Sequence, residues 1–144
     1  MENKTAPRSK KSYLPKLMMG VFTLVIIGLF TWNLPRGYSG DLSQIGQGKN
    51  IVVQVHDHYL VASSQLMENL HRVRADYGEA IEFIVADLQV AEGKAFAKTY
   101  NADAPTLLFF APDGKHIWTI HGVLEAQDLR NSLDKAFNLL ATKK

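Results

Sequence analysis

The sequence predicts an α/β domain whose four-stranded mixed sheet is flanked by helices, preceded by one N-terminal transmembrane helix. Two observations lead to this prediction: a charge-free apolar run near the N-terminus, and then segments in the order strand, helix, strand, helix, hairpin, helix. Strands separated by helices favour a parallel β-α-β unit, and a hairpin adds two antiparallel strands. The 144 residues have room for one membrane segment and one domain of roughly 100 residues.

The apolar run extends from Leu17 to Pro35 without a charged residue. A helix of that length crosses a hydrocarbon core of roughly 30 Å. Five basic residues precede the run and Arg36 alone follows it closely, so the positive-inside bias predicts a cytoplasmic N-terminus. A cleaved signal peptide is the alternative, although the run is longer than a usual signal segment and is followed by a poor cleavage site.

These features divide the chain into four parts. They are a basic cytoplasmic tail (1–16), a single transmembrane helix (17–35), a flexible stalk rich in glycine (36–49) and a folded domain (50–144). In a bacterial source, the anchor would lie in the inner (cytoplasmic) membrane and the domain in the periplasm. The expected partners are the lipid bilayer and another envelope or membrane protein.

Charge is distributed unevenly along the chain. Residues 1–36 hold six basic side chains and one acidic one, whereas the remainder holds ten basic and thirteen acidic ones. The folded part therefore lacks the basic surface of a nucleic-acid-binding protein, and no nucleic-acid partner is predicted. The chain has no cysteine, so its stability must come from packing without disulfides.

Four apolar segments predict the strands. The β-branched run Ile51–Val55 is typical of a buried strand, and Ile81–Asp87 predicts a second one. Thr106–Phe110 and His116–Ile120 flank an Ala-Pro-Asp-Gly sequence that is typical of a turn. These last two segments therefore predict an antiparallel hairpin.

Three segments have helical spacing. Leu66, Leu70, Val73 and Tyr77 form one apolar stripe of a helix over 63–77. A second helix is predicted over 91–100, with Ala95 and Phe96 buried. The third is predicted over 126–141, and its inward residues are Leu129, Leu133, Phe137 and Leu140.

The segment Asp103–Lys115 (DAPTLLFFAPDGK), followed by Gly122, resembles the thioredoxin superfamily, in particular its membrane-tethered periplasmic members. The resemblance covers about Asn50–Leu140, and the family's first strand and helix are missing or replaced by the stalk. It implies a thioredoxin-like fold and a cis bond between Ala104 and Pro105.

The family's W-C-x-x-C motif corresponds to Tyr59-Leu60-Val61-Ala62-Ser63, so the resemblance places the two cysteines at Leu60 and Ser63. Disulfide exchange needs a thiolate, which neither side chain provides. The family's buried acidic residue corresponds to Gln54, which does not titrate. We therefore expect no redox activity, no other catalysis and no cofactor.

The predicted function is a non-redox interaction protein, an accessory or assembly factor for another envelope or membrane protein. In the family, the backbone before the cis-proline pairs with an extended segment, and such a groove does not require cysteine. Tyr59, Leu60 and Val61 belong either to the core or to an exposed binding patch. The predicted partner-binding residues are Tyr59, Leu60, Val61, Ala62, Ser63, Ala104, Pro105, His121 and Gly122.

Two alternatives rest on other side chains. His56, His58 and His121 suggest an extracytoplasmic metal-binding protein, although ligand spacing without cysteine is weak evidence. Ser63 and Ser64 near His58 suggest a nucleophile and its base. Serines at a helix start are far more often caps, so the hydrolytic alternative ranks third.

Overall fold

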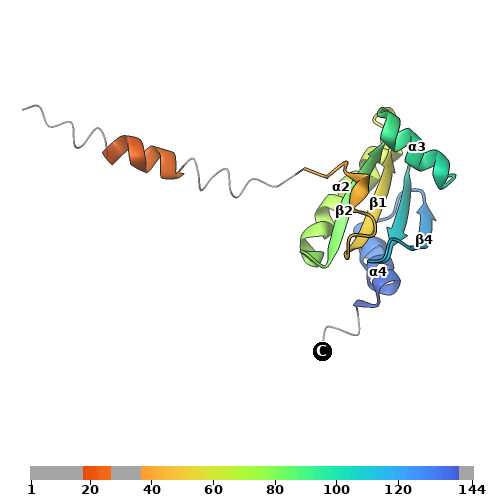
Figure 1. Ribbon diagram of the computed structural model, residues 1–144. Coiled ribbons are helices and arrows are strands. Elements are labelled where there is room, and N and C mark those ends of the chain that lie inside the picture. The colour runs from red at the N-terminus through yellow and green to blue at the C-terminus, as the bar shows by residue number, and fades with distance from the viewer. Residues whose placement is uncertain (1–17, 27–36, 140–144) are drawn as a thin grey trace, which may run out of the picture. The chain divides into compact units, whose positions relative to one another are not determined.

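The computed structural model describes residues 18–26 and 37–139 (Figure 1). The chain divides into two compact units, Met1–Gly37 and Tyr38–Lys144. Residues 18–26 are helical and belong to the expected membrane span. The expected tail at 1–16, and residues 17 and 27–35 of that span, lie outside the described residues. Among the residues described, no helix is both long enough and apolar enough to cross a membrane.

A four-stranded mixed sheet forms the centre of the second unit, as predicted. Its strands are β1 (Asn50–His56), β2 (Ile81–Asp87), β3 (Thr106–Phe110) and β4 (His116–His121). They lie in the order β2-β1-β3-β4, with β1 parallel to β2 and antiparallel to β3. β3 and β4 form the predicted antiparallel hairpin.

Helices cover both faces of the sheet (Figure 1). α2 (Val61–Tyr77) and α4 (Ala126–Phe137) pack on one face, where Leu66, Leu70 and Leu129 join a cluster with Val52 and Phe109. α3 (Ala91–Thr99) packs on the other face. Its side chains join a second cluster with alternate residues of the same strands, including Ile51, Val53 and Phe110. Strands buried on both faces explain the continuous apolar runs in the sequence.

The inward face of α3 differs from the prediction. Phe96 is buried as expected, but Ala95 is exposed and Ala97 is buried in its place. α3 lies very close to the end of β2 at Gly93, where a Cβ atom would come within 2.1 Å of the carbonyl oxygen of Asp87. This close approach sets which side of the short helix faces the sheet. In α4, Leu129 and Leu133 are buried as predicted, and Leu140 lies outside the described residues.

The compact unit begins at Tyr38 rather than at the predicted Asn50. Residues 38–49, expected to form a flexible stalk, lie against the domain instead. The backbone N–H of Val85 donates to the carbonyl of Ser39 at 2.9 Å, which adds one parallel bridge outside β2. A single 3-10 turn, η1 (Leu42–Gln44), follows, and Leu42 packs against the second cluster. The resemblance implied that a first strand and helix are missing or replaced by the stalk, and this segment contributes one bridge and one turn.

Candidate functional site

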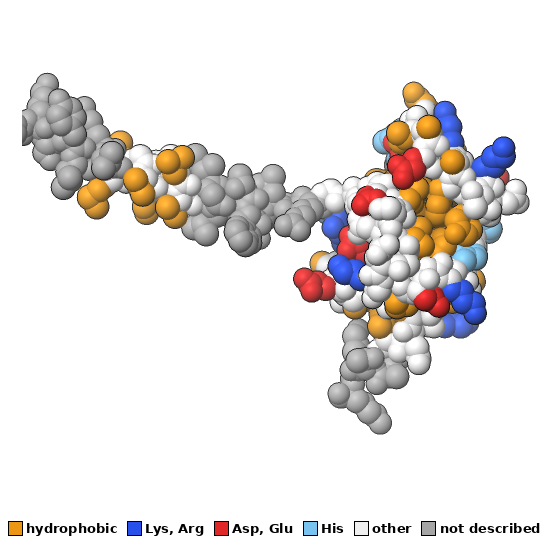
Figure 2. Space-filling view, in the orientation of Figure 1, with side chains coloured by type: hydrophobic (Ala, Val, Ile, Leu, Met, Phe, Trp, Pro, Cys, Tyr) orange, Lys and Arg blue, Asp and Glu red, His pale blue; other side chains and the backbone are white. Residues whose placement is uncertain are grey.

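The loop between β1 and α2, together with the first residue of α2, presents apolar side chains to the surface. Tyr59 is 86% exposed, Val61 is 73% exposed and Leu60 is 38% exposed. The sequence left two interpretations open for these residues, namely core packing and an exposed patch. Their exposure excludes core packing. Apolar side chains are visible at this end of the domain, where β1 and β2 end (Figure 2). We call Tyr59, Leu60 and Val61 the apolar loop.

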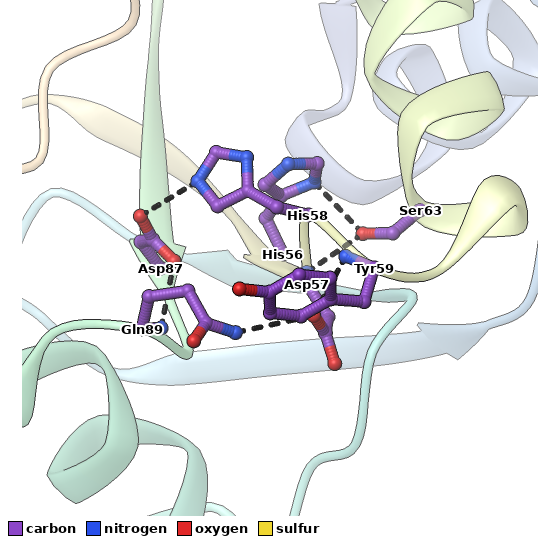
Figure 3. A network of polar contacts seen from close by, with 7 residues as sticks. All are labelled: His56, Asp57, His58, Tyr59, Ser63, Asp87 and Gln89. Carbon is purple, nitrogen blue, oxygen red and sulfur yellow. Dashed lines mark hydrogen bonds and ion pairs between the residues drawn. The ribbon is translucent and has the colours of Figure 1, made fainter.

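A network of polar contacts holds this loop in place (Figure 3). The Ser63 hydroxyl oxygen, at the start of α2, accepts a hydrogen bond from the backbone N–H of Asp57 at 3.0 Å. The Asp57 carboxylate in turn accepts from the backbone N–H of Tyr59 at 3.0 Å and from the Gln89 amide at 3.3 Å. Both ends of the loop are therefore tied to the fold, so its exposed side chains project from a defined backbone.

His56 and Ser63 form a buried pair. The Ser63 hydroxyl oxygen lies 2.8 Å from His56 Nδ1. Ser63 is 0% exposed and His56 is 3% exposed. Burial, followed by the proximity of His58, lowers the pKa of His56. A neutral imidazole accepts at one ring nitrogen, and the Ser63 hydroxyl proton is free to donate because its oxygen already accepts from Asp57. The pair therefore acts as a structural contact between β1 and α2.

His58 and Asp87 connect the loop to the neighbouring strand. His58 Nε2 lies 2.9 Å from Asp87 Oδ2, and the backbone N–H of Gln89 donates to Asp87 Oδ1 at 2.8 Å. These contacts hold the pKa of Asp87 below its usual value, and the hydrogen bond from the Gln89 backbone N–H has the largest effect. Asp87 is therefore a carboxylate over the ordinary pH range, which favours the hydrogen bond to His58.

Gln54, which the resemblance aligned with a buried acid, is itself buried. Its amide nitrogen donates to the carbonyl oxygen of Ser63 at 2.8 Å. Its amide oxygen is buried and has no hydrogen-bond partner within the described chain. The position therefore stays polar and supports the start of α2, but it carries no group that titrates.

The loop before β3 lies beside the end of β1, because Val55 and Thr106 are paired across the two strands. The Ala104-Pro105 bond is cis, as the resemblance implied. The Pro105 carbonyl accepts from the N–H of Gly122 at 2.9 Å. Among the described residues, the backbone N–H and C=O of Ala104 have no hydrogen-bond partner. Ala104 therefore offers one free backbone donor and one acceptor.

The predicted binding residues thus gather at one end of the sheet, where β1 and β4 end and β3 begins. Their exposure falls into three classes. Tyr59, Leu60, Val61 and His121 are exposed, Ala62, Ala104, Pro105 and Gly122 are half-buried, and Ser63 is buried. Ser63 consequently supports the loop from below and is not available for contact with a partner.

The three histidines of the metal alternative each have a separate partner. His56 contacts Ser63, His58 contacts Asp87, and His121 Nδ1 lies 3.0 Å from the Thr106 hydroxyl. Within 18–26 and 37–139, no group of three or more His, Cys, Asp or Glu side chains is placed to hold a metal ion. The arrangement gives the metal alternative no support.

The serine-histidine pair also differs from the hydrolytic alternative. That alternative paired Ser63 or Ser64 with His58, whereas Ser63 contacts His56 and Ser64 is exposed. Because Ser63 and His56 are both buried, a substrate has no access to their contact.

Asp57, Asp87 and Gln89 were not among the predicted site residues. Asp87 is the last residue of β2 and Asp57 directly follows β1, and adjacent parallel strands end at the same edge of a sheet. That positional signal places the two carboxylates together. The sequence has no comparable signal for the Gln89 side chain, which comes from the loop after β2.

No protein-family model matches the chain, and no curated protein matches it either. Solved structures do match. One is thioredoxin-2, described as a component of malaria parasite protein secretion machinery, which is 16% identical over 60% of this chain and 82% of that chain, with a TM-score of 0.55. At this identity the likeness concerns the fold alone. The described domain has a thioredoxin-like α/β fold.

Proposed function

We propose that the chain is a non-redox interaction protein that binds an extended segment of another envelope or membrane protein. The observation that carries this proposal is the apolar loop, held by the polar network beside the free backbone groups of Ala104. Apolar side chains contribute affinity when they are covered, and a free backbone donor and acceptor can pair with one residue of a strand-like peptide. The site binds a segment and performs no chemistry on it.

The absence of catalysis is part of the proposal. The chain has no cysteine to attack a disulfide, and the serine-histidine contact between Ser63 and His56 is buried. A solvent-excluded pair has no route to a substrate.

Membrane tethering is also part of the proposal. It rests on the charge-free run 17–35 and on the five basic residues that precede it, which favour an N-terminus in the cytoplasm. A tether of this kind would hold the binding loop near other membrane proteins and raise their effective concentration.

Site-specific photo-crosslinking from the full-length chain in its native membrane tests the binding site. A photoreactive phenylalanine analogue replaces Tyr59 in one sample and Glu79 in another. Both side chains are exposed, but Glu79 precedes β2 and lies at the opposite end of that strand. We expect a defined partner to be crosslinked from position 59 and not from position 79. The same products from both positions, or none from position 59, would contradict the proposal.

A further inference from the structure

A hollow lined in part by Asp87, which contacts His58 of the loop network, points to the chemistry of the bound segment. Its volume is about 340 Å³, and it lies between the end of β2 and the start of α3. Tyr38, Val85 and Val90 supply apolar side chains to its wall, and Asp87 and Glu92 also line it. Asp87 is the residue that holds His58, so the hollow adjoins the loop network.

The charged residues that line the hollow are Asp87 and Glu92, and no lysine or arginine is among its lining residues. Two cations lie next to that lining: Lys94 follows Gly93 on α3, and the Arg74 guanidinium is 4.7 Å from the centre of the Tyr38 ring. The nearby segments 56–63 and 101–106 add the carboxylates of Asp57 and Asp103 and no lysine or arginine. Of these carboxylates, only Asp87 has a charged or titratable partner, His58, among the described residues. A cationic partner is therefore favoured over an anionic one.

We propose that the segment bound at the apolar loop carries a lysine or arginine whose side chain enters this hollow. This inference rests on the proposed function and adds the chemical class of its partner. The apolar wall suits the aliphatic stem of such a side chain, and the carboxylates suit its charged end. The smallness of the hollow fits a single long side chain better than a second element of structure.

The sheet order limits where the basic residue stands in the segment. The hollow is beside β2, the apolar loop follows β1, and Ala104 precedes β3, so the segment crosses two strand spacings. That distance is about 10 Å, and an extended chain advances roughly 3.3 Å per residue. The lysine or arginine is therefore about three residues from the residue that pairs with Ala104.

Binding of three short peptides to the full-length chain tests this inference. All have the same alternating valine-threonine core, and they differ only in a terminal lysine, glutamine or glutamate placed three residues from the central valine. We expect the lysine peptide to bind about tenfold more tightly than the glutamate peptide at low salt, and the difference to shrink as salt is raised. Glu92→Gln should reduce this preference severalfold, whereas the matched control Glu79→Gln should leave it unchanged.

The outcomes separate this inference from the function on which it rests. Equal affinity for the three peptides would overturn the basic preference and leave the proposed function standing. A lysine preference that Glu92→Gln does not reduce would overturn the assignment of the hollow. Failure of every peptide to bind would count against both.

Discussion

The Ser63 hydroxyl joins three parts of the site at the scale of single residues. Its oxygen accepts from the Asp57 N–H, it contacts His56 Nδ1, and the carbonyl of the same residue accepts from Gln54. The resemblance placed a cysteine of the redox motif at this position, and a small hydroxyl makes two hydrogen bonds there. The side chain at position 63 therefore supports the loop through its contacts.

Removal of that hydroxyl should therefore destabilise the fold. Ser63→Ala leaves the Asp57 N–H and a ring nitrogen of His56 without this partner in a buried place, which costs about 1–3 kcal/mol. Urea unfolding of the full-length chain measures the change. The matched control is Ser64→Ala, because Ser64 is exposed. Equal stability of the two variants would show that the buried contact is not important.

The His56 side chain should make stability depend on pH. Burial lowers the pKa of His56 in the folded chain below its ordinary value of 6.5, so the unfolded chain takes up the proton first as the pH falls. This contribution to stability is thus complete well above about pH 6.5 and is lost progressively below it. Unfolding midpoints measured from about pH 7 to about pH 5 should fall less in His56→Asn than in the unchanged chain.

The exposed His71 on α2 provides the control for that experiment. His71→Asn should keep the full pH dependence of the unchanged chain. A pH dependence that is the same in all three proteins would assign the effect to other groups.

At the scale of elements, the strands and helices were predictable because each buries a continuous or periodic set of apolar side chains. The segment 38–49 was not predictable in this way. Its three glycines resemble a linker, yet the Ser39 carbonyl bonds to β2 and Leu42 packs against the core. A single bridge and a single turn are too short to produce a periodic pattern of apolar residues, so the sequence does not reveal them as elements of structure.

Substitutions in the apolar loop should affect the stability of the fold less than substitutions of buried residues in the neighbouring helix α2. Leu60→Asp alters a side chain that is already partly exposed, so we expect the free energy of unfolding to change by less than about 1 kcal/mol. Leu66→Ala removes a fully buried side chain six residues later and should cost about 2–5 kcal/mol. Chemical denaturation compares them. A large loss of stability in Leu60→Asp would mean that Leu60 is part of the core.

At the scale of the whole molecule, a thioredoxin-like fold occurs in a chain that has no cysteine. The full-length chain should therefore give no insulin reduction above the uncatalysed rate with any thiol reductant, because no thiolate is available to attack sulfur. A cysteine-containing thioredoxin in the same assay is the positive control. Clear turnover by this chain would refute the non-redox account.

The location of the candidate site was predictable from the sequence, whereas its supporting contacts were not. The cis-proline loop and the end of β1 come together because sheet order follows from the sequence of elements. The exposure of Tyr59 depends on whether the loop folds back on the core, and that depends on contacts from Gln89 and Asp87 far away in sequence. Apolar composition alone does not distinguish a core residue from an exposed one.

Three strand-like backbone edges in the described domain have unpaired groups: the Ala104 loop, the outer edge of β4, and the outer edge of β2, which is paired with Ser39 at a single bridge. The central claim assigns binding to the first of these. All three edges are able, on geometry alone, to accept an extended peptide, since each offers backbone donors and acceptors. They belong to different segments of the chain, so a measurement that resolves single segments separates them.

Amide hydrogen exchange of the full-length chain, with and without a saturating amount of the lysine peptide, tests this claim most directly. The account predicts slower exchange in residues 57–61 and at Ala104 when the peptide is bound, with no change along Ile117–Thr119 of β4. Slower exchange along β4, with residues 57–61 and Ala104 unchanged, would contradict it.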